Sequence, residues 1–280
     1  MALIICGHPR SGTTLLRALC VSHPQIVLTS EFGNFSQLDI PPRVYRRFIL
    51  RNWWSARNRP YFSEKAPGYD EALGGPAPSL LVRWAQKYTG IHLLQNLVFC
   101  LHFLSQLPAR PTGLVDVTAI DTALHRLFPH ARVVGDKNPD YVFALDRLAP
   151  QVGLECVVVY RDPRDMTSSV LKMARSKIGK WWNAEMKSPR GIAQRWVIAM
   201  RLLQRHRNRV YAIRYEDLIA EPPVVLNELA QRLDVDPNGF SMSIIRPGSV
   251  GKHHSGLNPA ELETVLQVAG PLMQQLGYSI

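Results

Sequence analysis

Short apolar segments alternate along the chain with longer segments whose apolar residues recur at helical spacing. The segments that predict strands are rich in β-branched and aliphatic residues and lie at 3–6, 25–28, 113–116, 132–134, 154–160 and 210–214. Such alternation is typical of βαβ units, in which helices cover both faces of a parallel sheet. The pattern therefore predicts an α/β fold with a mostly parallel sheet, and the run 155–160 is the clearest candidate for a central strand.

Helical spacing, often with proline near the first turn, marks a second set of segments. These predicted helices lie at 12–23, 78–107, 119–128, 141–148, 164–177, 189–207, 223–233 and 259–276. The stretches 52–78 and 237–259 read as irregular, and excursions of this kind in α/β enzymes often cover a binding site. With no internal repeat or linker, we expect a single domain over residues 1–280, with an irregular excursion at about 32–107.

Composition narrows the class of protein. The chain of 280 residues has a formal net charge of +11, which favours anionic partners such as a nucleotide, a nucleic acid or an acidic peptide. Four well-separated cysteines form no metal-ligand spacing, so we expect buried reduced thiols and no metal site. The apolar stretch 91–107 is shorter than a bilayer span and carries polar residues, which predicts a buried core helix.

The strongest local signal is the sequence GHPRSGTT at 7–14, directly after the first strand and at the start of a helix. Backbone amides and a helix N-terminus bind anions in this setting. The spacing resembles a Walker A loop, but Thr13 occupies the position of the lysine that triphosphatases use together with magnesium. Arg10 is the cation in the loop and is suited to one tetrahedral anion. The alternative is a strand-to-helix turn that binds no ligand.

A second anion site is predicted at the end of the strand 154–160. Arg161 follows that strand, and Ser169 lies in the second turn of the next helix, so both can reach one anion. Two anion sites at one sheet edge suit a ligand that is phosphorylated at both ends of a ribose. The alternative is structural: Asp162 caps the helix while Arg161 pairs with a nearby carboxylate.

Taken together, these motifs resemble those of sulfotransferases that use 3′-phosphoadenosine 5′-phosphosulfate (PAPS). Residues 9–16 are similar to the family's 5′-phosphosulfate loop, and Arg161 with Ser169 matches its 3′-phosphate pair. The segments 136–139, 213–218 and 257–278 extend the resemblance over nearly the whole chain. Arg10 in place of a lysine resembles the tyrosylprotein-like and bacterial branch. The resemblance implies a P-loop-type parallel sheet.

The resemblance also implies roles for individual residues. Glu31 matches the general base, while Arg10 and Lys137 would meet the charge that develops as the S–O bond breaks. The loop residues that would hold the 5′-phosphate are Ser11, Gly12, Thr13 and Thr14, and those for the 3′-phosphate are Arg161, Ser169 and Lys252. Lys252 belongs to a segment, 245–253, that resembles a nucleotide-closing loop. Tyr215 either packs near the nucleotide or is a core residue. We expect that the transfer reaction requires no metal.

Several alternatives stay open. Histidines 8, 92 and 102 are reserve candidates for the base, and the adjacent pair at 253 and 254 suits a solvated or acceptor-facing role better than a metal site. The rival functions are a P-loop kinase that acts on ATP with magnesium, and a basic nucleic-acid binding module, for which no recognisable motif appears. We expect a cytoplasmic bacterial enzyme that binds neither nucleic acid nor membrane and takes a small acceptor in preference to a peptide.

Overall fold

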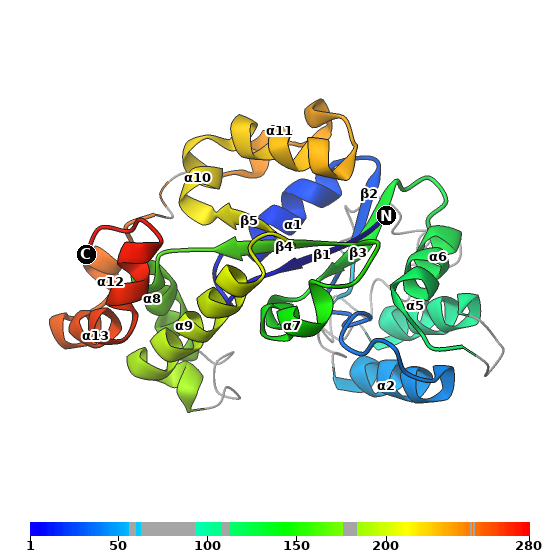
Figure 1. Cartoon of the computed structure of the whole chain (residues 1–280), viewed down its shortest axis with the longest axis horizontal. Helices are drawn as coiled ribbons and strands as arrows, with labels where there is room; N and C mark the ends of the chain where they lie inside the picture. Colours follow the sequence, from blue (N-terminus) through cyan, green and yellow to red (C-terminus); the bar gives the residue numbers. More distant parts are fainter. Residues whose placement is uncertain (56–59, 63–92, 108–112, 176–183, 247, 249) are drawn as a thin grey trace.

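The computed structural model describes residues 1–55, 60–62, 93–107, 113–175, 184–246, 248 and 250–280. Within these residues the strands form a five-stranded sheet of order β2-β3-β1-β4-β5 in which every neighbouring pair is parallel. The strands are β1 (Ala2–Cys6), β2 (Ile26–Ser30), β3 (Val133–Lys137), β4 (Leu154–Tyr160) and β5 (Tyr211–Arg214). The predicted α/β class is confirmed: β1 is the middle strand of the sheet, and β4 is an interior strand between β1 and β5 (Figure 1).

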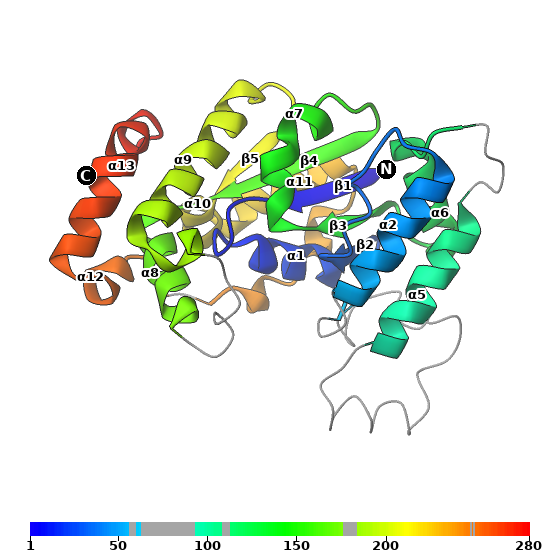
Figure 2. The ribbon, with the colours of Figure 1, turned by 90° about the horizontal axis from the view of Figure 1, so that it is seen from below.

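Helices cover both faces of the sheet, as predicted (Figures 1 and 2). The α-helices are α1 (Thr13–Ser22), α2 (Pro42–Ser55), α5 (Leu93–Gln106), α6 (Val117–Leu127), α7 (Leu145–Leu148), α8 (Pro163–Ala174), α9 (Pro189–Arg205), α10 (Tyr215–Ala220), α11 (Pro222–Leu233), α12 (His253–Gly256) and α13 (Pro259–Gln275). Short 3-10 helices are η1 (Pro139–Ala144), η3 (Glu185–Lys187), η4 (Pro237–Gly239) and η5 (Met242–Ile244). Helices α1, α10 and α11 lie on one face, and α7, α8 and α9 lie on the other.

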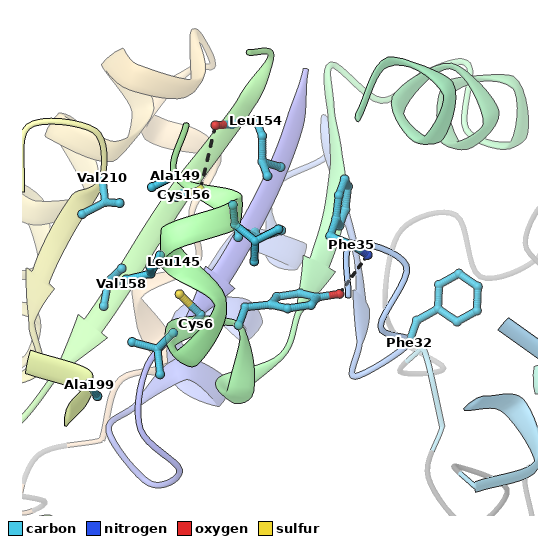
Figure 3. Close-up of a cluster of buried hydrophobic side chains, with 14 of the residues drawn as sticks. Cys6, Phe32, Phe35, Leu145, Ala149, Leu154, Cys156, Val158, Ala199 and Val210 are labelled. Atoms are coloured by element: carbon cyan, nitrogen blue, oxygen red, sulfur yellow. Dashed lines mark hydrogen bonds between the residues drawn. The ribbon is translucent and has the colours of Figure 1, made fainter. Parts of the chain in front are cut away.

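The alternation of side chains along the strands divides the core into two layers. Leu3 and Ile5 of β1 face the layer under α1 and α11, while Ile4 and Cys6 face the layer under α7 and α9. Figure 3 shows this second layer, where Cys6 lies near Val158 of β4. The fully apolar burial of β1 explains why it reads as a continuous apolar run instead of an alternating one.

Helix starts follow the capping signals of the sequence. Asp116, Ser188 and Asn258 accept hydrogen bonds from the first-turn amides of α6, α9 and α13, and Asn258 forms a capping box with Glu261. Proline occupies the first turn of α8, α9, α11 and α13, where its missing N–H costs nothing. These caps fix where α8 and α13 begin, which matters for the site described below.

Some predictions about elements are wrong. Residues 113–116 form no strand, because Val115 makes only an isolated antiparallel bridge with Ile40. Helix α2 occupies 42–55, within the excursion that was expected to be irregular. Helices α10 and α12 were not predicted either. Helix α5 confirms the buried helix over part of 91–107, whereas 78–92 lies outside the described residues. No helix in the described part of the chain has the length and apolarity to cross a membrane.

Candidate functional site

Most of the predicted site residues lie at the carboxyl ends of the strands, whereas Ser169 lies in α8 and Lys252 at the start of α12. The 7–14 loop follows β1, Glu31 follows β2, Lys137 ends β3, and Arg161 follows β4. Tyr215 follows β5 at the start of α10. Because the strands are parallel, these ends meet at one edge of the sheet, where open α/β folds bind ligands. Residues distant in sequence are thereby gathered at one place.

The loop after β1 has the backbone of an anion-binding turn. Arg10 and Gly12 both have positive φ, 73° and 109°, and the amide of Ser11 donates to the carbonyl of His8 at 3.0 Å. Gly12 is held against Tyr215, since a Cβ on it would lie 2.3 Å from the tyrosine ring. α1 starts immediately afterwards, so the first-turn amides of Thr13 and Thr14 have no intrahelical partner. The loop therefore presents a helix N-terminus at the sheet edge.

The hydroxyl residues of this loop are placed differently from one another. Thr14 is exposed, whereas Thr13 is buried. The Ser11 hydroxyl is buried beside Gly7 and has no hydrogen-bond partner among the residues that the structure describes. Ser11 and Thr13 therefore contribute to the loop's packing in this structure, and the exposed side chains are those of Arg10 and Thr14.

The two predicted anion sites are in direct contact. The Nε of Arg10 in the β1 loop donates to the Oγ of Ser169 in α8 at 3.0 Å. Across the same region, the Arg161 guanidinium lies 4.5 Å from the centre of the Tyr215 ring, and Tyr215 in turn packs on Gly12. Tyr215 is thus a core residue that also contacts one residue of each predicted site. Arg10, Ser169, Arg161 and Tyr215 form one continuous site.

The structural alternative for Arg161 is also present in this geometry. Arg161 donates to the carboxylate of Asp165 at 3.2 Å, and its backbone carbonyl accepts from the indole of Trp196 at 3.0 Å. Asp162 caps α8 by accepting from the amide of Arg164. These contacts fix Arg161 in place at the end of β4.

Glu31 and Lys137 form an ion pair at the neighbouring strand ends. Lys137 Nζ donates to Glu31 Oε1 at 2.9 Å, and the side chains are 4 % and 27 % exposed, so the carboxylate is the more accessible partner. The backbone amide of Glu31 also donates to the carbonyl of Lys137 at 2.7 Å, which holds Glu31 at a φ of 59°. A carboxylate beside an ammonium at a basic edge is equipped to accept a proton or to orient a hydroxyl.

Asp136 underlies this pair and was not assigned a role from the sequence. Its fully buried carboxylate accepts hydrogen bonds from the hydroxyls of Thr29 and Tyr141 at 2.6 and 2.7 Å. It also accepts from the amides of Phe32 and Gly33, at 3.2 and 2.9 Å, in the turn that carries Glu31. A carboxylate at the end of an otherwise apolar strand is the sequence signal that marks such a residue.

The histidines are distributed differently from the expectation. His8 is buried, its Nδ1 lies 2.9 Å from the carbonyl of Pro9, and burial lowers its pKa to about 4, which makes it a weak base at neutral pH. His102 lies on α5, and residue 92 lies outside the described residues. The solvated role expected for His253 is wrong, because His253 is buried and its Nδ1 donates to Asp165 at 2.7 Å. His254 beside it is exposed.

Lys252 is exposed at the N-terminus of the short helix α12, in the segment predicted to close over the nucleotide. Helix α12, which follows directly after Lys252, is tied to α8: Gly256 approaches Ser168 so closely that a Cβ on it would lie 2.0 Å from the serine Oγ. Ser168 is the neighbour of Ser169, so the segment lies beside the predicted 3′-phosphate site. The contacts that anchor this region to α8 had no signal in the sequence.

Comparison with known proteins adds independent findings. The profile of the sulfotransferase family matches residues 2–238. The fold is similar to the sulfotransferase domain of the Synechococcus PCC 7002 olefin synthase, with 16 % identity, TM-score 0.59 and coverage of 100 % of this chain and 95 % of that chain. No curated protein matches the sequence.

Two further solved structures show the same fold. The sulfotransferase domain from the curacin biosynthetic pathway has 18 % identity and a TM-score of 0.56, covering 100 % of this chain and 98 % of that one. A sulfotransferase from Alicyclobacillus acidocaldarius has 16 % identity and a TM-score of 0.51, covering 99 % and 96 %. At these identities the likeness concerns the fold alone.

Proposed function

This chain belongs to the sulfotransferase family, and on that premise we propose that it transfers a sulfuryl group from PAPS to a hydroxyl or amine acceptor and releases adenosine 3′,5′-bisphosphate. One observation carries the proposal: the β1 loop and the Arg161 region, predicted to hold opposite ends of a doubly phosphorylated nucleotide, are joined by the hydrogen bond from Arg10 to Ser169. A single ligand can therefore contact both.

In the proposed reaction the acceptor attacks sulfur in line with the leaving group. A new bond forms between the acceptor oxygen or nitrogen and sulfur, while the bond from sulfur to the bridging oxygen breaks and its electron pair stays on the 5′-phosphate. Glu31 takes the acceptor proton, and Arg10 and Lys137 stabilise the charge on the sulfuryl and bridging oxygens. The reaction needs alignment and charge stabilisation, as phosphoryl transfer does, and we propose that no metal is required.

The nucleotide contacts divide between the two ends of the ribose. We assign the 5′-phosphate to the N-terminus of α1 with Ser11, Gly12, Thr13 and Thr14, and the 3′-phosphate to Arg161, Ser169 and Lys252. We infer that the loop adjusts when ligand binds and turns the Ser11 hydroxyl toward the phosphate, since this buried hydroxyl has no hydrogen-bond partner within the described part of the chain. Tyr215 supports both ends, since it touches Gly12 on one side and Arg161 on the other.

The acceptor side is proposed to be built by the excursion at 32–107. Phe32, the residue after Glu31, packs against Tyr61, Phe99 and Phe103 with ring centroids 4.9, 5.0 and 5.2 Å away. These rings come from the excursion and fix the turn that carries Glu31, so the excursion directly supports the proposed base. All four rings are buried in the core, so they position the turn that carries Glu31 and do not themselves face the acceptor.

The test is calorimetric titration with adenosine 3′,5′-bisphosphate in the absence of metal. The wild type should bind it more tightly than ATP, and Arg161→Ala should weaken binding by about 100-fold, because a charge-assisted contact to phosphate is lost. Arg209→Ala is the matched control, since Arg209 is exposed just before β5, at the opposite end of the strands from the site, and its loss should leave binding unchanged.

Other outcomes would point to the rival functions. Tighter binding of ATP with magnesium than of the bisphosphate would refute the proposal in favour of a kinase. Absence of nucleotide binding together with steeply salt-dependent binding of DNA or RNA would favour a nucleic-acid module.

A further inference from the structure

Asp165, in the first turn of α8, is buried and surrounded by donors. It is 1 % exposed, and its oxygen Oδ2 accepts from Arg161 at 3.2 Å and from the amide of Gly251 at 2.8 Å. The other oxygen, Oδ1, accepts from the amide of His253 at 2.9 Å and from His253 Nδ1 at 2.7 Å. Burial alone would raise the pKa of Asp165, but these hydrogen bonds together with the charge of Arg161 lower it, so the carboxylate stays ionised.

These contacts fill the carboxylate's hydrogen-bonding capacity. A carboxylate has about four lone-pair sites, and two donors lie at each oxygen of Asp165. Asp165 therefore has no position left for a ligand, and its negative charge would repel a phosphate. A role in binding has to act through the groups that it holds.

The groups held by Asp165 belong to the two halves of the proposed 3′-phosphate site. Arg161 is the cation at the end of β4, and Gly251 and His253 are the two neighbours of Lys252. Because the amides on both sides of Lys252 are fixed to one carboxylate, the backbone of Lys252 is fixed relative to Arg161, some ninety residues earlier, although its side chain is exposed. The close approach of Gly256 to Ser168 holds the C-terminal end of α12 against α8.

We propose that Asp165, with His253, is a positioning residue that sets Arg161 and Lys252 as one unit for recognition of a nucleotide 3′-phosphate, an inference that rests on the proposed function. A helix-capping or packing role alone would stabilise α8 without favouring one nucleotide over another. The positioning role concerns one phosphate, so its loss should appear as a change in selectivity.

Two nucleotides that differ only at the 3′ position isolate this effect. The ratio of the dissociation constants of adenosine 5′-monophosphate and adenosine 3′,5′-bisphosphate reports the contribution of the 3′-phosphate. In Asp165→Asn an amide nitrogen, which cannot accept, replaces one carboxylate oxygen and faces two hydrogen-bond donors. Arg161 and the backbone around Lys252 should therefore no longer be held at a fixed separation. We expect the ratio to fall by ~10-fold or more, as for loss of one charge-assisted contact, while the affinity for the monophosphate stays within about twofold.

Matched variants separate the positioning role from general damage. Asp162→Asn changes the same residue type at the start of the same helix, keeps an oxygen for capping, and should leave the ratio unchanged. His253→Leu should lower the ratio, whereas His253→Asn should retain most of it, because the asparagine N–H can donate where Nδ1 does. Thermal unfolding of each variant shows whether it is folded.

The outcomes discriminate between the inference and the function on which it rests. A folded Asp165→Asn protein with the wild-type ratio overturns the inference, as does equal weakening of both nucleotides, which indicates a purely structural role. If Asp165→Asn does not fold, the two His253 variants provide the test, and identical ratios in His253→Leu and His253→Asn overturn the inference. A wild type that fails to prefer the bisphosphate overturns the proposed function itself.

Discussion

His8 should make the stability of this protein depend on pH below neutrality. Burial lowers the pKa of His8 to about 4, with a further contribution from the charge of Arg195, while the hydrogen bond to the Pro9 carbonyl opposes the change. In the unfolded chain a histidine titrates near its ordinary value of about 6.5. Between these values the unfolded chain binds the proton and the folded chain does not, so acidification favours unfolding.

The size of the effect follows from these two values. The free energy of unfolding should fall by roughly 1.4 kcal/mol for each pH unit over most of the window between about 6.5 and about 4. Between pH 7 and pH 5 the contribution of His8 is therefore about 2 kcal/mol, after integration over the onset of titration. Below about pH 4 both states are protonated and the dependence on this residue ends.

The assay compares urea unfolding of the wild type and His8→Asn at several pH values from 7 to 5. Asparagine keeps an N–H for the Pro9 carbonyl but does not titrate, so the variant should lose about 2 kcal/mol less than the wild type over this range. His130 is exposed, and His130→Asn should keep the wild-type decline. Equal declines in the wild type and His8→Asn would refute the assignment of a buried neutral imidazole.

Two further predictions concern the site. Glu31→Gln should lower turnover by roughly 100-fold or more, measured by steady-state rates, and leave the binding of adenosine 3′,5′-bisphosphate unchanged in calorimetry. Wild-type turnover in this variant would contradict the assignment of Glu31 as the base. Gly12→Ala should destabilise the fold by about 1–3 kcal/mol more than Gly153→Ala in urea unfolding, because both glycines have positive φ but only Gly12 has a ring, that of Tyr215, in the path of a Cβ; equal losses would show that the Tyr215 contact is unimportant.

Much of the fold could be predicted from the sequence because periodicity reports burial. Every strand in the described ranges was expected within a few residues, since buried parallel strands read as unbroken apolar runs. The failed strand at 113–116 has the same local pattern, and what it lacks is a neighbour in the sheet. Strand pairing is a tertiary property, so local pattern alone could not separate these cases.

The sequence was enough to predict which residues lie together in the site, but not which of them form hydrogen bonds or ion pairs with each other. Sequence position places Glu31, Lys137 and Arg161 at strand ends, and parallel strands bring such ends together. In the structure Lys137 pairs with Glu31 and Arg10 donates to Ser169, and neither pairing was predicted. These choices depend on register and on the left-handed backbone at Arg10 and Glu31, neither of which has a sequence signal in a residue that is not glycine.

The buried carboxylates give the site a common electrostatic plan. Asp136 lies behind Glu31 and Lys137, and Asp165 lies behind Arg161, and each takes its hydrogen bonds from fixed amides and side chains. A basic edge that is to bind a doubly anionic nucleotide must hold several cations close together, which costs free energy when the ligand is absent. Carboxylates on the inner side offset that repulsion without competing for the ligand, because their hydrogen-bonding positions are occupied. Since the pKa of Asp165 is lowered, its compensating charge is present above the unfolded-state pKa of an aspartate and is lost only as the pH falls through the lower folded value. A loss of nucleotide affinity between pH 7 and pH 5 would therefore have to arise elsewhere in the site.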